Sequence, residues 1–242
     1  MGEVLLIHGA WHGAWCWDEL IPELEARGHA ARAIDLPGLG ADQTPNDQVT
    51  LDAYAQRIAD EVRAMGPRVW LTGHSMGGLA ITQAAEHVCD RLAGLIYVTA
   101  AVPLDGQSMS QAFAATGEQT VAARMSFDPE TNTAYVADEH LRDMFYNLCS
   151  DAQVERARRL LRPRQPLAPT STPVSVSPER FGSVPRYYVE CLQDHALPIG
   201  FQRAMHRAAG MDGVATLEAD HSPFFSCPAE LAAAMDGFIA RG

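Results

Sequence analysis

Lysine is absent from this chain, and all 18 basic residues among its 242 residues are arginine. Schiff-base chemistry, a serine–lysine dyad and a lysine clamp on phosphate all require a lysine side chain, so these mechanisms are excluded. Positive charge is also outnumbered, because 30 acidic residues give a formal net charge of −12. Nucleic acid and anionic membranes are therefore not expected as partners.

Patterns typical of metal sites and membrane proteins are lacking as well. No apolar run reaches membrane-spanning length, and no charged and apolar leader opens the chain. The five cysteines show neither CxxC pairs nor cysteine–histidine spacing suited to zinc. We expect a cytoplasmic protein without a metal, in which the cysteines are small buried hydrophobic residues: Cys16, Cys89, Cys149, Cys191 and Cys227.

Short apolar segments alternate with stretches of helical periodicity along most of the chain. The first pair is EVLLIHGA over 3–10, which is too short for a helix and ends near a glycine, and a helical pattern over 15–27. This alternation predicts an α/β fold with a mostly parallel sheet and helices on both faces. We expect strands over 3–10, 29–36, 68–73, 92–99, 186–194 and 213–219, and helices over 15–27, 51–65, 77–88, 201–209 and 228–239.

The alternation stops at Pro103 and resumes at Arg186. Between them lie a helical stretch over 139–161 and a proline-rich passage over 162–178, but no strand that the sheet needs. An unstructured loop of this length inside a compact domain is improbable. We therefore predict a core formed by residues 1–102 and 186–242, and a helical cap inserted over residues 103–185.

A nucleophile motif stands between the strand expected over 68–73 and the helix expected over 77–88. The sequence GHSMG fits G-x-S-x-G, in which a tight turn strains the serine backbone and the flanking glycines let neighbouring chain segments pass. The turn lifts the hydroxyl above the sheet edge, at the positive end of the following helix. Ser75 is the predicted nucleophile.

A serine hydroxyl needs a base within hydrogen-bond reach, and His221 is the preferred candidate. It follows the last expected strand, and the chain order serine, acid, histidine accompanies this motif. His8 and His74 stand at strand ends, where a structural role is favoured. The other six fall on expected surface loops or helices and receive no role: His12, His29, His87, His140, His195 and His206.

The third catalytic member should be a carboxylate that orients the imidazole and stabilises the imidazolium. Asp194, at the end of the strand expected over 186–194, is the preferred residue. Asp105, just past the preceding strand, is the alternative. Glu190 is expected to point into solvent or toward a helix, and Asp220 to be a turn residue that cannot orient the ring.

Backbone N–H groups should stabilise the negative charge that develops on the substrate carbonyl oxygen. Met76, the residue after the nucleophile, is one expected donor, and Ala10, in the His8-Gly9-Ala10 segment after the first strand, is the other. The expected substrate-binding residues are Gly9, Ala10, Phe145 and Ser222. Aromatic side chains in the cap favour an apolar or aromatic acyl group, although each of them also fits ordinary packing: Phe113, Phe127, Phe145 and Tyr146.

Longer motifs extend across nearly the whole chain. They include HGAWHGAWCW over 8–17, AIDLPG over 33–38, GHSMGG over 73–78, YNLCS over 146–150, LRP over 161–163, ERFGSV over 179–184, LP over 197–198, FQR over 201–203 and DHS over 220–222. Together they resemble the plant methylesterase and hydroxynitrile lyase group, and bacterial esterases of the pyrethroid-hydrolase type are similar.

The resemblance implies an α/β-hydrolase fold with a parallel six-stranded sheet, a helical cap over the site, no cofactor and often a homodimer. It supports the roles already given to Ser75, Asp194, His221, Ala10 and Met76. Residues 105–138 have no clear counterpart in the group, so the resemblance does not imply which ester is the substrate.

Three functions are compatible with these residues. Hydrolysis of a small ester through an acyl-enzyme is the leading hypothesis, and carbon–carbon lyase chemistry or a ligand receptor with negligible turnover are the alternatives. In the lyase relatives, a lysine follows the catalytic histidine and a threonine follows the first-strand histidine. Ser222 and Gly9 occupy those positions here, which favours ester cleavage over cyanohydrin cleavage.

Overall fold

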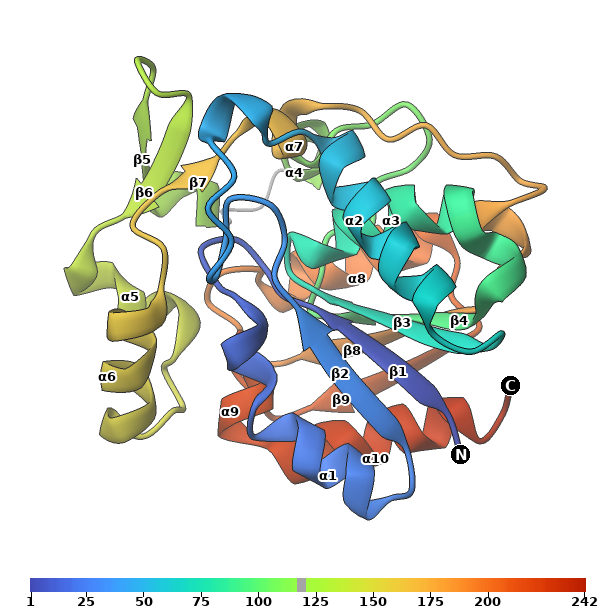
Figure 1. Ribbon diagram of the computed structural model, residues 1–242. Coiled ribbons are helices and arrows are strands. Elements are labelled where there is room, and N and C mark those ends of the chain that lie inside the picture. The colour runs from blue at the N-terminus through green and yellow to red at the C-terminus, as the bar shows by residue number, and fades with distance from the viewer. Residues whose placement is uncertain (117–120) are drawn as a thin grey trace.

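Figure 1 shows the computed structural model, which describes residues 1–116 and 121–242. Its main sheet has six strands in the order β2-β1-β3-β4-β8-β9, and every neighbouring pair is parallel. The α/β fold and the six-stranded parallel sheet expected from the sequence are confirmed. The strands are β1 (Glu3–Ile7), β2 (Ala30–Ile34), β3 (Val69–His74), β4 (Leu92–Val98), β8 (Arg186–Cys191) and β9 (Gly213–Leu217).

Central and edge strands of the main sheet differ in burial. Strands β3 and β4 are buried along nearly their whole length, because helices cover both faces of a parallel sheet. The edge strands β2 and β9 instead alternate between more and less exposed positions. The central strands therefore read as apolar runs, and they form the middle of the hydrophobic core.

Helices cover both faces of the sheet (Figure 1). Helices α1 and α10 pack together on one face, and α2 and α3 pack together on the other. The helix expected over 15–27 is divided into a short 3-10 helix and α1. The core helices are η1 (Ala14–Trp17), α1 (Leu20–Ala26), η2 (Asn46–Gln48), α2 (Leu51–Ala64), α3 (Gly77–Val88), η3 (Cys89–Arg91), α8 (Ile199–Ala209), α9 (Pro223–Ser226) and α10 (Pro228–Ile239).

Residues 103–185, named here the insert, connect β4 to β8. Residues 117–120, which the expected cap includes, lie outside the described residues. The insert contains α4 (Met109–Thr116), η4 (Val121–Arg124), β5 (Met125–Asp128), β6 (Thr133–Val136), α5 (Asp138–Phe145), α6 (Asp151–Leu160), β7 (Gln165–Pro166), α7 (Ala168–Ser171) and η5 (Phe181–Ser183).

Two features of the insert differ from the expectation. Strands β5, β6 and β7 form a small antiparallel sheet, so the insert is not purely helical, and in its described part no strand joins the main sheet. The helix expected over 139–161 is broken at 146–150. There Ser150 begins α6 with a capping box, in which its side chain and that of Gln153 bind each other's backbone N–H groups.

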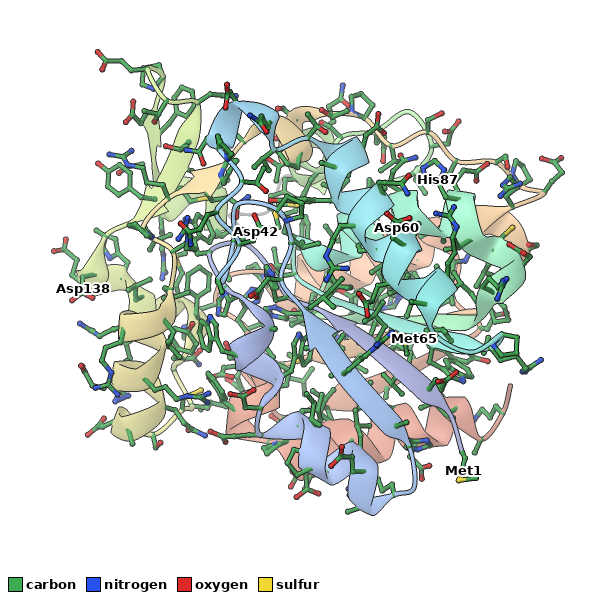
Figure 2. The ribbon with its side chains drawn as sticks, in the orientation of Figure 1. Met1, Asp42, Asp60, Met65, His87 and Asp138 are labelled. Atoms are coloured by element: carbon green, nitrogen blue, oxygen red, sulfur yellow. The ribbon has the colours of Figure 1, made fainter. Side chains whose placement is uncertain are left out.

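Elements α4 to α7 and β5 to β7 of the insert lie beyond the carboxyl ends of the main strands, whereas residues 172–185 run back past α3 to the start of β8 (Figure 1). Both chain termini lie at the opposite end of the sheet. Figure 2 labels Asp138 at the outer edge of the insert, where it pairs with Arg158 of α6. Other arginine–carboxylate pairs join Arg124 to Asp143 and Arg164 to Asp128. Exposed ion pairs of this kind link the elements of the insert to one another.

Within the described residues, no helix is both long enough and apolar enough to span a bilayer. The same residues contain no cluster of three or more histidine, cysteine or acidic side chains suited to a metal ion. All five cysteines are free thiols, and the expected burial is confirmed for Cys16, Cys149 and Cys191, whereas Cys89 and Cys227 are partly exposed.

Candidate active site

The strand order places a crevice at the carboxyl ends of β1 and β3. Strand β1 has β2 on one side and β3 on the other, so the connections that leave β1 and β3 run in opposite directions. Such a switch in strand order opens the crevice in which open α/β sheets bind ligands. The loop that begins at His8 and the turn at Ser75 meet at this point.

Ser75 occupies a strained turn between β3 and α3. Its φ angle is 52°, in the left-handed region that residues with a side chain rarely adopt. A Cβ atom on Gly73 would lie 2.6 Å from the Gly77 carbonyl oxygen, and one on Gly77 would lie 2.7 Å from the His8 carbonyl oxygen. Both glycines of the motif are therefore required by close backbone contacts, as the sequence predicted.

The structure brings Ser75, His221 and Asp194 into one hydrogen-bonded row. The Ser75 Oγ atom lies 3.0 Å from His221 Nε2, and His221 Nδ1 lies 2.7 Å from Asp194 Oδ2. His221 and Asp194 are buried, while Ser75 is partly exposed. This geometry lets the imidazole accept the serine proton while the carboxylate stabilises the resulting positive charge.

Asp194 is held by four donors. Its Oδ1 atom accepts hydrogen bonds from the backbone N–H groups of Ala196 and Leu197, each at 2.7 Å. Its Oδ2 atom accepts from Thr99 Oγ1 as well as from His221. No role was expected for Thr99 from the sequence, although its position at the end of the strand expected over 92–99 places it beside the site.

Asp105, the alternative acid, lies elsewhere. Its carboxylate is exposed and accepts a hydrogen bond from the backbone N–H of Val176 at 2.9 Å. Of the two candidates, Asp194 is therefore the one bonded to the imidazole of His221.

Two other acidic residues are buried. Glu190 points toward a helix, which is one of its two expected directions: Arg203 and His206 of α8 bind its carboxylate, as does Thr216 of β9. Asp220 is also fully buried and is more than a turn residue. It accepts hydrogen bonds from residues of the insert as well as from residues that follow His221.

His8 and His74 have structural partners, as expected. His74 Nε2 donates to the carbonyl oxygen of His221 at 2.7 Å, and burial together with nearby His221 holds the pKa of His74 well below its usual value. His8 Nε2 accepts from the Leu36 N–H at 3.1 Å. Both rings therefore support the backbone around the site.

The expectation of surface positions is wrong for three of the six remaining histidines. His12, His29 and His206 are buried, whereas His87, His140 and His195 are exposed. The buried rings have partners that are distant in sequence: Tyr146 for His12, Asp236 for His29 and Glu190 for His206. A surface prediction from local pattern fails where the partner comes from another part of the chain.

A cavity of about 390 Å³ opens onto Ser75 and His221. Core and insert residues both line it, and among the described residues its wall carries no arginine, aspartate or glutamate. The wall comprises Ala10, Trp11, His12, Ser75, Met109, Ser110, Phe113, Ala114, Val121, Ala122, Ala123, Met125, Phe145, Gln165, Leu167, Thr170 and His221.

The candidate substrate-binding residues fall into two groups. Ala10 and Phe145 line the cavity, and the Phe145 ring lies 5.5 Å from the His221 ring, centre to centre. Gly9 and Ser222 are not part of the wall. Gly9 lies so close to Ser75 that a Cβ atom would approach the Ser75 Cβ to 2.9 Å, and Ser222 is fully buried.

The aromatic residues of the insert also divide. Phe113 lines the cavity and packs edge-to-face on Phe201 of α8. Tyr146 is fully buried without being part of the wall, and Phe127 is 60% exposed. Of the four aromatic residues singled out in the sequence, Phe113 and Phe145 are those that a substrate in the cavity would contact.

A family model described as the alpha/beta hydrolase family matches residues 4–234. Methylesterase 7 of Arabidopsis thaliana is 32% identical over 245 residues, which covers 95% of this chain and 93% of that protein. A pyrethroid hydrolase of Sphingobium wenxiniae is 34% identical, with 98% of this chain and 87% of the other covered. The chain spans 61% of a longer relative, the chloroplastic methylesterase 11 of Arabidopsis thaliana, at 34% identity.

Solved structures give the same result. A pyrethroid hydrolase from Sphingobium faniae superposes with a TM-score of 0.87 at 31% identity, over 99% of this chain and 97% of that one. A methylesterase from Arabidopsis superposes with a TM-score of 0.85 at 26% identity over the whole of both chains. The similarity therefore includes the insert as well as the main sheet.

Proposed function

Because the chain belongs to the alpha/beta hydrolase family, we propose that it hydrolyses carboxylic esters through an acyl-enzyme on Ser75. The observation that carries the proposal is the row formed by Ser75, His221 and Asp194, with distances of 3.0 and 2.7 Å. The relatives named as methylesterases and pyrethroid hydrolases support the same reaction class.

The reaction has two halves. Ser75 Oγ attacks the ester carbonyl carbon while His221 Nε2 takes the serine proton, and collapse of the tetrahedral intermediate expels the alcohol, which receives that proton. Water then attacks the acyl-enzyme, His221 accepts a proton from the water, and the acid leaves as Ser75 regains its proton. Asp194 stabilises the imidazolium in both halves.

The backbone N–H groups of Ala10 and Met76 are proposed to form the oxyanion hole. Neither group has a hydrogen-bond partner among the described residues, so both are available to a substrate oxygen. Met76 directly precedes α3, where N–H groups are unpaired within the helix and the helix dipole favours negative charge.

Residues 103–185 are proposed to act as a cap that sorts acyl groups. The uncharged wall of the cavity favours a neutral, apolar or aromatic acyl group, because a buried charge without a partner is costly. The volume of about 390 Å³ suits a small ester. We further propose a cytoplasmic enzyme, and the family resemblance supports one that needs no cofactor and can form a homodimer.

Two substrates offered to the same purified protein test this proposal. We expect release of acid from an aryl acetate and no release of cyanide from mandelonitrile, since the described cavity wall lacks a cation that could stabilise departing cyanide. Ser75→Ala should abolish the ester reaction, with a loss of about six orders of magnitude in kcat. Cyanide release that depends on Ser75, without ester turnover, would establish the lyase reaction instead.

A further inference from the structure

Residues 146–149, which join α5 to α6 and are named here the α5–α6 turn, contact three loops that carry proposed catalytic groups. The Tyr146 hydroxyl lies 2.6 Å from His12 Nε2, in the loop that contains Ala10. Asn147 Nδ2 donates to the Gln193 carbonyl oxygen, next to Asp194, at 3.1 Å. The Leu148 N–H donates to Asp220, next to His221, at 2.9 Å.

The hydrogen bond between Tyr146 and His12 connects the α5–α6 turn to the loop after β1. This loop contains Ala10 and is named here the oxyanion loop. His12 Nδ1 lies 2.7 Å from the Ala10 carbonyl oxygen, which can only accept, so Nδ1 carries the hydrogen. Nε2 of the uncharged ring is then an acceptor, and the Tyr146 hydroxyl donates to it. Burial lowers the pKa of His12 to about 3, an effect that nearby His221 and His8 strengthen, so the ring is uncharged at neutral pH.

Both ring nitrogens of His12 are thus occupied, although the ring forms part of the cavity wall. A ring with no free nitrogen cannot serve a substrate as acid or base. Its edge-to-face contact with Phe145 and its stacking on Trp15 fix its plane as well. The His12 ring is therefore suited to holding neighbouring residues in position.

The oxyanion loop needs such support, because Trp11, next to Ala10, has a φ angle of 61°. A left-handed conformation is unfavourable for a residue with a side chain, so the loop keeps it only where the surroundings impose it. The insert binds Trp11 on both sides of the backbone: its N–H donates to Gln165 Oε1 at 3.1 Å, and its carbonyl oxygen accepts from the Arg162 N–H at 2.8 Å.

We propose that Tyr146 and His12 are positioning residues for ester hydrolysis, which hold the Ala10 N–H in place for the oxyanion through a hydrogen-bonded chain anchored in the α5–α6 turn. This inference rests on the proposed ester hydrolysis. It makes the insert a structural requirement of the oxyanion hole as well as the wall of the substrate cavity.

Tyr146→Phe removes the hydroxyl and keeps the ring. We expect the acylation rate constant at saturating aryl acetate to fall about tenfold, less than for loss of an oxyanion donor, because Ala10 is displaced rather than removed. Binding of phenylboronic acid, whose adduct with Ser75 resembles the tetrahedral intermediate, should weaken by a similar factor. The dissociation constant of the unreacted ester should change less than twofold, and the fraction of Ser75 that a fluorophosphonate labels should not change.

Tyr135→Phe is the matched control, because it makes the same chemical change at an exposed position of β6 in the same insert. It should leave acylation and boronate binding unaltered. The double variant His12→Asn, Tyr146→Phe should lose no more than the larger of the two single losses, because both residues act through one chain. Independent, additive losses would overturn the proposal, as would a Tyr146→Phe enzyme with unchanged acylation.

A measurement on the unmodified protein keeps the inference testable if a variant does not fold. The nitrogen-15 shifts of His12 should report an uncharged ring protonated at Nδ1 from about pH 5 to pH 8. A charged ring, or a hydrogen on Nε2, would contradict the hydrogen-bonded chain even if the enzyme hydrolyses esters. Conversely, if the protein shows the expected nitrogen-15 shifts but no ester turnover, the proposed function is overturned while the hydrogen bonds of Tyr146, His12 and Ala10 are still supported.

Discussion

The core and the insert share one cavity but contribute different things to it. Ser75, Asp194 and His221 follow strands β3, β8 and β9 of the core, at the carboxyl edge of the main sheet. The insert contributes apolar wall residues such as Phe113 and Met125, and its elements are joined by exposed arginine–carboxylate pairs. The reacting side chains therefore come from the core, whereas the insert forms much of the wall that shapes the cavity.

Replacing one carboxylate in the core and one in the insert should give the largest difference in catalytic rate. Asp194→Asn in the core should lower kcat about 10⁴-fold, because an amide favours the wrong imidazole tautomer. Asp105→Asn in the insert makes the same chemical change at an exposed site bonded to the Val176 N–H, and it should cost less than twofold. Steady-state rates for an aryl ester compare them, and a larger loss in Asp105→Asn would move the catalytic acid into the insert.

Stability should show the same asymmetry. Glu190→Gln in the core should lower the free energy of unfolding by about 2 kcal/mol, because Arg203 and His206 lose a buried anionic partner. Asp138→Asn, which breaks an exposed pair with Arg158 in the insert, should cost about 0.5 kcal/mol or less. Urea unfolding at neutral pH measures both, and equal losses would remove the distinction between buried and exposed pairs.

The loss of stability in Glu190→Gln should depend on pH, and its direction follows from the sign of the pKa shift of Glu190. Although burial opposes ionisation, hydrogen bonds from Arg203, His206 and Thr216 lower the pKa of Glu190 from 4.5 to about 2. The folded state thus favours the ionised carboxylate of Glu190. The stabilisation that this carboxylate provides is complete above its pKa in the unfolded chain, about 4.5, and is lost as the pH falls toward 2. The gap between wild type and Glu190→Gln should therefore narrow below about pH 4.5.

Two phenylalanines test the role of the insert wall, with the smallest expected effect. Phe113→Ala should raise the preference for longer acyl chains about tenfold in relative kcat/KM, because it enlarges the cavity by most of a ring. Phe127→Ala removes an identical side chain that is 60% exposed on β5, and it should leave the preference unchanged. A panel of aryl esters of increasing acyl length measures both, and an equal shift in the two variants would argue against selection by the cavity wall.

The core could be predicted from the sequence because its strands leave a clear local signal. Buried parallel strands such as β3 and β4 require apolar runs, and the strained turn at Ser75 requires glycines at 73 and 77. Chain order then sufficed to select His221 and to prefer Asp194. The apolar runs and the glycines depend on residues close together in sequence, so pattern alone predicted them.

The insert gave weaker signals, for physical reasons. Strands β5 to β7 are two to four residues long and pair only with one another, so no apolar run marks them. The helical pattern over 139–161 continues through residues 146–150, although tertiary contacts of that turn break the helix. His12 was misjudged as a surface residue because its partner Tyr146 stands 134 positions away.

The central claim is that Ser75 becomes acylated during turnover. Rapid mixing with an aryl acetate, an acid quench and mass spectrometry of the digested protein measure this directly. We expect an acetyl group on the peptide that contains Ser75, formed at least as fast as turnover and absent from Ser75→Ala. Steady ester turnover without an adduct, or with the acetyl group on another residue, would contradict the account.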